Sequence, residues 1–162
     1  MTELALPKID KDIISRKDQI VSHLKKFTKD ENILSENEEI KPYETDGLAA
    51  YKQTPLAVVL PENTKEVSEI LKFCNEENIK VIPRGAGTGL SGGALPLQDA
   101  ILLGLGKFNK ILEIDFENKC VVTQPGVTNL GITHAVQHKG YYYAPDPSLS
   151  LIHISEPTRQ HA

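Results

Sequence analysis

The sequence predicts an α+β fold built around a mixed β-sheet. A strand, a helix and a second strand follow one another within residues 56–82, and three strand-like runs with short connectors follow within residues 100–124. The first pattern is typical of parallel strands joined through a helix, and the second of antiparallel neighbours. A chain of 162 residues is long enough for one domain with a sizeable core.

The strand–helix–strand unit has the clearest signals. Residues 56–60, LAVVL, form a continuous apolar run, which is typical of a strand buried on both faces. Asn63 and Glu66 have the spacing of a capping box at the start of the following helix. An apolar stripe along that helix consists of Val67, Ile70, Leu71 and Cys74, so we expect Cys74 in the core. The second strand covers residues 79–82, and we expect the two strands to pair in parallel with a right-handed crossover.

The N-terminal part is predicted to be a helix followed by a connector. Residues 13–28 give an amphipathic helix, with Ser15 as a cap for a shorter version. Its apolar face contains Ile13, Ile20, Leu24 and Phe27. Residues 31–47, ENILSENEEIKPYETDG, are polar and are interrupted by Pro42 and Gly47, so we expect a connector there.

After the strand–helix–strand unit the pattern changes to short strands. Residues 100–105, 110–115 and 119–124 are strand-like, and their short connectors predict antiparallel pairing. Pro125 and Gly126 form a turn, Thr128 caps a helix of about ten residues, and Gly140 ends that helix.

Composition bounds the class of protein. The formal net charge of −4, from 18 Lys plus Arg against 22 Asp plus Glu, argues against nucleic acid as the main partner. The two cysteines form no CxxC pair, which fits a reducing compartment. The N-terminus has no apolar core of a signal peptide, and no window predicts a transmembrane segment. We therefore expect a cytoplasmic protein, attached at most peripherally to the inner membrane through a partner.

The segment Pro83–Ala94, PRGAGTGLSGGA, has five glycines in twelve residues. Glycine lets a ligand approach the main chain, and successive bare N–H groups can form a nest for an anion such as phosphate. A flexible connector is the alternative, but it does not explain the nearby hydroxyls of Thr88 and Ser91 or the cation of Arg84. A Rossmann fingerprint needs a helix after GxGxxG, whereas LPL and a strand follow here. A P-loop needs GK[ST], which is absent from this segment.

Several motifs in order resemble one family. PLAVVLPENTKEV, RGAGTGLSGGALP, TQPGVTNL and YYYAPDPS, with KPYETDGLAAYKQTP upstream, resemble the first half of the FAD-binding domain of FAD-linked oxidases related to vanillyl-alcohol oxidase and p-cresol methylhydroxylase. Within that group the chain is most similar to the flavin subunit of glycolate oxidase, whose relatives include D-lactate dehydrogenases. The resemblance covers residues 41–148. It implies an N-terminal helical segment at 1–40 and a truncated FAD-binding domain at 41–150.

The resemblance implies a two-part FAD site. The first part would hold the diphosphate with the N–H groups of residues 85–90 and the two hydroxyls; its residues are Pro83, Arg84, Gly85, Ala86, Gly87, Thr88, Gly89, Leu90, Ser91 and Gly92. The second part is a proline-rich turn along the cofactor, formed by Pro145, Asp146 and Ser148. Pro125 and Gly126 would shape a nearby turn.

The reaction implied is oxidation of a small 2-hydroxy acid by hydride transfer to flavin. In the family the base and the substrate clamps lie mostly in a later domain, so the resemblance assigns no catalytic residue to this chain. Other subunits of a glycolate oxidase complex are possible partners. Residues 151–162 have the character of translated adapter sequence, and we expect that tail to be non-native. We also expect the 162-residue chain to bind FAD poorly.

Other candidates stay open. His134 and His138 have a spacing that could bind zinc, but HAVQH lacks the glutamate and a third ligand, so exposed histidines are the simpler interpretation. Covalent flavin attachment at Cys120 or His134 lacks a family motif. The tyrosines at 141–143 could stack on the flavin or pack beside the sheet. Arg84 could pair with phosphate or point to solvent. A noncatalytic nucleotide-binding module and another FAD enzyme, such as a cell-wall reductase using NADPH, are the alternative functions.

Overall fold

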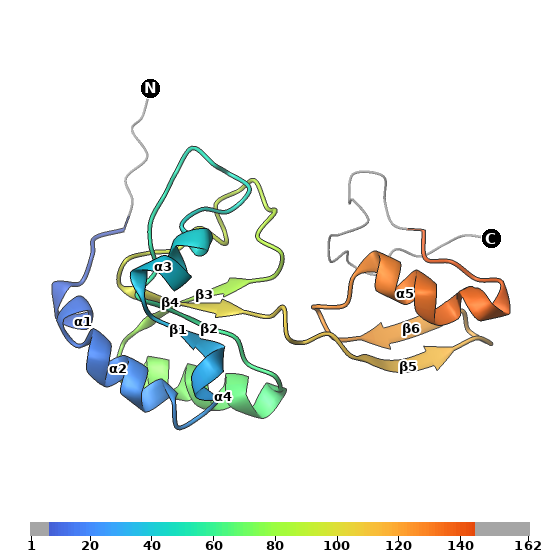
Figure 1. Cartoon of the computed structure of the whole chain (residues 1–162), viewed down its shortest axis with the longest axis horizontal. Helices are drawn as coiled ribbons and strands as arrows, with labels where there is room; N and C mark the ends of the chain where they lie inside the picture. The colour runs from blue at the N-terminus through green and yellow to red at the C-terminus, as the bar shows by residue number, and fades with distance from the viewer. Residues whose placement is uncertain (1–6, 145–162) are drawn as a thin grey trace.

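The computed structural model describes residues 7–144, which form a four-stranded sheet with helices on both faces and a separate two-stranded unit (Figure 1). The mixed α+β architecture predicted from the sequence is confirmed. The elements are α1 (Lys11–Ser15), α2 (Lys17–Leu24), β1 (Ile33–Leu34), α3 (Asn37–Ile40), β2 (Ala57–Val59), α4 (Thr64–Glu76), β3 (Lys80–Arg84), β4 (Ala100–Gly104), β5 (Ile111–Asp115), β6 (Cys120–Thr123) and α5 (Asn129–Val136), with 3-10 turns at Asp30–Asn32, Lys41–Tyr43 and Gln137–Lys139.

The strand order of the main sheet differs from the prediction. The order is β1-β2-β4-β3, so β4 lies between the two strands that were expected to pair directly. Strands β2 and β3 each pair with β4 in parallel, and the expected antiparallel pairing of β4 with the next strand is wrong. The physical reason is burial, because all five residues of β4 are buried whereas β3 carries Pro83, a residue that edge strands tolerate.

The predicted connector at residues 31–47 contains regular structure. Strand β1 pairs antiparallel with β2. Helix α3 follows β1 and lies on the face of the sheet opposite α2 and α4. Glu36 and Glu39 form a capping box at the start of α3. A two-residue strand inside a polar segment has too little periodicity to be found from the sequence.

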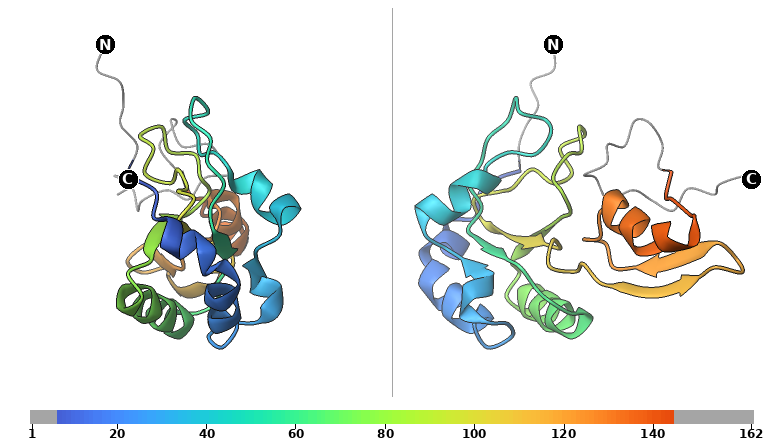
Figure 2. Two further views of the ribbon diagram at one scale, coloured as in Figure 1. Left: turned by 90° about the vertical axis from the view of Figure 1, so that its left-hand side faces the viewer. Right: turned by 45° about the vertical axis from the view of Figure 1, so that its right-hand side comes forward.

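The core lies on both faces of the main sheet. One face packs against α2 and α4, and the opposite face packs against α3, as the two views in Figure 2 show. Ala57 and Val59 face the first layer whereas Val58 faces the second, which confirms the prediction of a strand buried on both faces. Asn63 caps α4 by accepting from the N–H of Glu66, as predicted. The Glu66 side chain reaches the Asn63 amide and the Glu62 N–H rather than the Asn63 N–H.

The buried stripe of α4 is rotated from the predicted one. Ile70, Phe73 and Cys74 are buried, which confirms the core position of Cys74. Leu71 is 44% exposed, so its expected place on the buried face is wrong. Phe73 takes that place and stacks on His23 of α2, with ring centroids 4.3 Å apart.

The N-terminal helix is shorter than predicted and is interrupted. Asp10 caps α1 by accepting a hydrogen bond from the N–H of Asp12. The helix is interrupted at Arg16, and α2 then ends at Leu24 rather than at residue 28. Ser15 is not a cap, because its hydroxyl donates to the carbonyl of Asp12. Asp10 is the stronger cap, because it precedes the first helical turn in an extended conformation.

The second unit is a β-hairpin covered by one helix. Strands β5 and β6 are antiparallel, as predicted, and α5, in which Ile132 and Val136 are buried, lies over them (Figure 1). Thr128 caps α5 through the N–H of Gly131, and Gly140 ends the final turn in the left-handed region, both as predicted. No helix within residues 7–144 is long and apolar enough to cross a membrane.

Candidate functional site

The glycine-rich segment lies at the carboxyl end of β3, where it begins the connection to β4 (Figures 1 and 2). Residues 85–99 carry the chain back to the start of a parallel neighbour without a helix. Clefts beyond the carboxyl ends of parallel strands are the usual ligand sites of such sheets. The segment therefore connects two parallel strands and lies at an edge of the sheet where ligand sites are common.

The backbone of this segment offers unused donors. No N–H group from Gly85 to Leu90 donates a hydrogen bond to any other residue within 7–144. Gly87 and Gly92 have φ values of 72° and 74°, a backbone conformation that residues with a Cβ rarely adopt. The hydroxyl-bearing Thr88 and Ser91 are exposed on the same loop. Successive N–H groups without a partner, next to glycines with positive φ, are typical of anion-binding loops.

Arg84 stands at the base of this loop. Its Nη1 donates to the carbonyl oxygen of Tyr43 at 3.1 Å, and its guanidinium carbon lies 5.6 Å from the centre of the Tyr43 ring. Among the described residues Arg84 forms no ion pair with a carboxylate, although eight ion pairs occur elsewhere in them. The positive charge is therefore uncompensated beside the free N–H groups, which favours the pairing with phosphate over the alternative of solvent alone.

A second loop, residues 44–53, packs directly on the glycine segment. A Cβ built on Gly47 would lie 2.6 Å from the carbonyl oxygen of Thr88 and 2.8 Å from that of Gly89. Asp46 is buried, and its Oδ1 accepts from the N–H of Leu48 at 2.9 Å. This stretch resembles the family in sequence, but no place in the site was predicted for it. The Asp-Gly pair is the signal that could have pointed to a tight turn here.

Other predicted candidates are dispersed. Pro145, Asp146 and Ser148 lie outside the described residues, as does the tail at 151–162. Tyr142 is 68% exposed, Tyr141 lies 5.7 Å from the Phe116 ring, and the N–H of Tyr143 donates to Thr133.

The histidines and cysteines are also separate from the glycine segment. His134 and His138 are both exposed, and His138 is edge-on to Phe116. Within residues 7–144 no group of three His, Cys, Asp or Glu side chains could hold a metal ion. Cys74 is buried and Cys120 is exposed.

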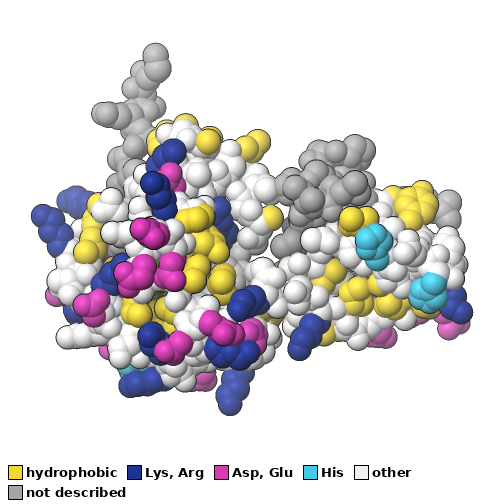
Figure 3. Space-filling view, viewed as in Figure 1, with side chains coloured by type: hydrophobic (Ala, Val, Ile, Leu, Met, Phe, Trp, Pro, Cys, Tyr) yellow, Lys and Arg dark blue, Asp and Glu magenta, His cyan; other side chains and the backbone are white. Residues whose placement is uncertain are grey.

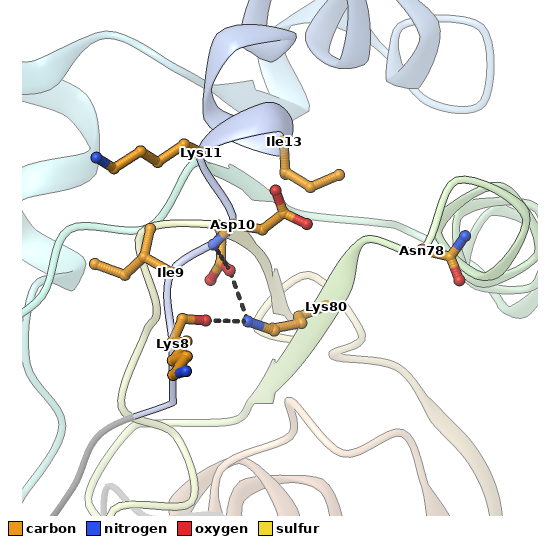
Figure 4. Close-up of a pocket in the computed structure, with 8 residues that line it drawn as sticks. Lys8, Ile9, Asp10, Lys11, Ile13, Asn78 and Lys80 are labelled. Carbon is orange, nitrogen blue, oxygen red and sulfur yellow. Dashed lines mark hydrogen bonds and ion pairs between the residues drawn. The ribbon is translucent and has the colours of Figure 1, made fainter.

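A cavity of about 350 Å³ lies at the other end of β3 (Figure 4). It is lined by Lys8, Ile9, Asp10, Lys11, Ile13, Asn78, Lys80 and Asp99. Lys80 begins β3 and Arg84 ends it, so this cavity and the glycine segment are at opposite ends of the strand. The cavity is therefore not part of the anion-binding arrangement. On the face drawn in Figure 3 the acidic and basic side chains alternate, without a continuous basic area of the kind that binds nucleic acid.

Comparison with known proteins assigns the chain to a family. Residues 55–152 match the family model described as FAD binding domain. The chain belongs to this family of FAD-binding domains. The domain is similar to the glycolate oxidase subunit GlcD of Escherichia coli strain K12, with 45% identity over 147 residues, which are 91% of this chain and 28% of that protein. It is also similar to the D-lactate dehydrogenase of Anaerostipes hadrus, with 41% identity over 63% of this chain and 22% of that protein.

The fold of the domain is that of a known group. The crystal structure of p-cresol methylhydroxylase with substrate bound matches it with a TM-score of 0.68 and 27% identity, over 78% of this chain and 25% of that chain. The predicted family, fold group and cofactor are thereby confirmed. The chain spans less than a third of the length of each of these proteins.

The residues of the glycine segment fit FAD. The diphosphate of FAD is an anion rich in acceptor oxygens, and the segment offers unpaired N–H donors, two exposed hydroxyls and a guanidinium that forms no ion pair with a carboxylate among the described residues. The backbone carbonyls of Thr88 and Gly89 leave no space for a side chain at Gly47, and the φ of 72° at Gly87 favours glycine there. The individual contacts to FAD at residues 83–92 remain predictions.

Proposed function

We propose that this domain is the first part of the FAD site of an oxidoreductase that oxidises a small 2-hydroxy acid, of the glycolate or D-lactate type. The observation that supports it most is the row of unpaired N–H groups beside Arg84 in a chain of the FAD-binding domain family. Glycolate oxidase and D-lactate dehydrogenase are the similar proteins that point to the substrate class. FAD, when bound, would accept the hydride from the substrate.

The role proposed for the described residues is to bind and orient the cofactor. The N–H groups of residues 85–90 would hold the diphosphate, with Arg84 neutralising part of its charge. Charge-assisted hydrogen bonds of this kind contribute about 1.5–3 kcal/mol each, so several of them could retain FAD without a covalent bond. We propose that the substrate clamps and the base belong to a further domain of the enzyme, in keeping with the fraction of each relative that the chain spans.

The domain boundaries and partners are part of the same proposal. We propose a helical segment at residues 1–40, the FAD-binding domain at 41–150 and a non-native tail at 151–162. Because the similar E. coli protein is named a subunit, we also propose further subunits. The free thiols of Cys74 and Cys120 favour a reducing compartment, which agrees with a cytoplasmic enzyme that is at most peripheral to a membrane.

Reduction of bound flavin by substrate tests the proposal. The enzyme that contains this domain is purified and its flavin absorbance is recorded anaerobically while glycolate or D-lactate is added. We expect yellow flavin that bleaches with one of these acids. Flavin that stays oxidised with both would contradict the substrate class, and a purified protein without flavin that gains none on adding FAD would contradict the cofactor site. Binding of a nucleotide without any reducible flavin would instead favour the noncatalytic module.

A further inference from the structure

Asp46 carries a buried acceptor that the described part of the chain does not satisfy. The residue is 6% exposed, and its Oδ1 accepts from the N–H of Leu48 at 2.9 Å. Its Oδ2 is buried and has no hydrogen-bond partner. A buried polar atom without a partner is unfavourable, and native proteins retain few of them. The hydrogen bond to Oδ1 is sufficient to stabilise the turn, so the turn gives no reason for a second, buried carboxylate oxygen.

The position of Asp46 links it to the glycine segment. The next residue, Gly47, lies against the carbonyl oxygens of Thr88 and Gly89 so closely that a Cβ would not fit. The same loop returns at Gln53, whose N–H donates to the carbonyl of Glu44 and whose Oε1 is a second buried acceptor without a partner in the described residues. Two unused acceptors therefore lie on one loop that packs on a row of unused donors.

The chemistry of these atoms selects their complement. The donors of the glycine segment suit phosphate oxygens, which only accept. A carboxylate oxygen repels phosphate and requires an O–H or N–H donor instead. In FAD the diphosphate is joined on one side to the ribose of adenosine and on the other side to the ribityl chain. Hydroxyl groups are thus the donors nearest to a bound diphosphate in either direction.

We propose that Oδ2 of Asp46 accepts a hydrogen bond from a hydroxyl of the sugar or ribityl chain next to the FAD diphosphate. Asp46 is then a positioning residue for the cofactor, and loop 44–53 is a second wall of the site. This inference rests on the proposed function as an FAD site. It explains why a loop that packs on the glycine segment keeps a buried acceptor unpaired while the N–H groups of that segment are also unpaired.

Replacement of Asp46 by serine separates this role from the turn. In Asp46→Ser the hydroxyl can still accept from the N–H of Leu48, because Ser forms the same kind of turn, whereas the Oδ2 position is lost. The matched control is Asp18→Ser, because Asp18 is exposed on α2. FAD affinity is measured by flavin fluorescence in the apoprotein of the enzyme that contains this domain, and melting temperature is measured without FAD.

The two readouts separate if the proposal holds, because FAD affinity falls whereas stability without FAD does not. We expect Asp46→Ser to weaken FAD binding roughly tenfold or more, the size typical of a lost hydrogen bond to a charged group. We expect its melting temperature without FAD to stay equal or rise, because an unpaired buried acceptor is removed. Wild-type affinity in this variant would overturn the proposal, and so would a lower melting temperature without FAD, which would assign Oδ2 a structural partner in the protein.

A second ligand identifies the hydroxyl. ADP contains the diphosphate and the ribose but not the ribityl chain, so its affinity is measured in the same two proteins. An equal loss for ADP and FAD assigns the ribose, and a loss for FAD alone assigns the ribityl chain; a loss for neither overturns the proposal. If the wild-type protein binds neither ligand, the proposed FAD site itself is wrong, and this result is distinct from a wild-type protein that binds FAD while the variant binds it equally well.

Discussion

The guanidinium of Arg84 occupies the space that a side chain on Gly87 would need. A Cβ built on Gly87 would lie 2.5 Å from both Nε and Nη2 of Arg84. The backbone of Gly87 has a φ of 72°, so the position also disfavours a side chain for conformational reasons. A side chain at position 87 would therefore have to move the Arg84 guanidinium and also adopt an unfavourable backbone conformation.

Gly87→Val is expected to abolish FAD retention in the enzyme that contains this domain. The new side chain would displace Arg84 and force the left-handed conformation on a β-branched residue, which costs at least about 1–2 kcal/mol. The measurement is the ratio of flavin to protein absorbance after purification. Gly93→Ala is the control, because a Cβ on Gly93 meets no atom within 4 Å. Full flavin occupancy in Gly87→Val would show that the segment is a linker.

Arg84→Gln is expected to weaken FAD binding at least tenfold, since one charge-assisted contact to the diphosphate would be lost, about 1.5–3 kcal/mol. Arg84→Lys keeps the charge without the planar fork, and we expect an intermediate affinity. Titration of the apoprotein with FAD at two salt concentrations measures the effect. The wild-type affinity should fall more steeply with salt than that of the glutamine variant, and equal salt slopes would contradict contact with the phosphate.

Gly47→Ala is expected to displace the glycine segment. The added methyl group meets the backbone carbonyls of Thr88 and Gly89, which cannot move as a side chain could. We expect a lower melting temperature and weaker FAD binding, in contrast to Gly106→Ala, where a Cβ has open space. Unchanged FAD affinity and stability in Gly47→Ala would contradict the packing of loop 44–53 on the glycine segment.

The two cysteines are expected to differ in reactivity. Burial raises the pKa of the Cys74 thiol to about 11, so it stays protonated and inaccessible at neutral pH, whereas Cys120 is exposed on β6. A chromogenic disulfide reagent should titrate one thiol quickly in the native chain and two in urea. In Cys120→Ser the fast phase should disappear. A fast reaction of Cys74 in the native chain would contradict the burial of α4 against the sheet.

Local features of this fold could be predicted from the sequence, whereas the sheet order could not. The Asn63 cap, the antiparallel pair β5–β6 and the Thr128 cap depend on residues close in sequence, where spacing carries the information. Residues 85–99 join β3 to its parallel neighbour β4 without a helix. Their sequence therefore has no helical periodicity that would indicate a crossover between parallel strands. On α4 two apolar faces are possible, one that includes Leu71 and one that includes Phe73, and both contain Ile70 and Cys74. Only packing against the rest of the fold determines which face is buried.

The candidate site was predictable only in part for the same reason. The glycine segment is visible as composition, and the motifs around it identified the cofactor. The contact between Gly47 and Thr88 joins residues far apart in sequence, and nothing in either segment alone indicates it. The unpaired state of Asp46 Oδ2 is likewise a property of the folded chain, since an Asp-Gly turn is ordinarily read as a solvent-exposed turn.

Asp99 is expected to make the stability of the domain depend on pH. Its side chain is 2% exposed and accepts from Lys80 Nζ at 2.6 Å and from the N–H of Asp10 at 2.7 Å. Lys80 also donates to the carbonyl of Lys8, so these contacts join residues 8–10 to the start of β3 and to the residue before β4, beside the cavity in Figure 4. Burial raises the pKa of Asp99, but the hydrogen bonds from Lys80 and Asp10 together lower it below its ordinary value of 3.8.

The sign of the pH effect follows from the lowered pKa. A carboxyl group with a lower pKa in the folded state stabilises the fold above the unfolded-state pKa, and this contribution is lost as the pH falls through the folded-state value. Asp99→Asn should therefore lower the free energy of unfolding by about 2 kcal/mol at pH 7. The difference between wild type and variant should persist at pH 5 and shrink below pH 3.8. Urea unfolding of both proteins at pH 7, 5 and 3 measures this difference. The other carboxyl groups are the same in both proteins, so their titration cancels in the comparison. A difference that is the same at all three pH values would show that Asp99 does not carry the charge that holds Lys80 and Asp10.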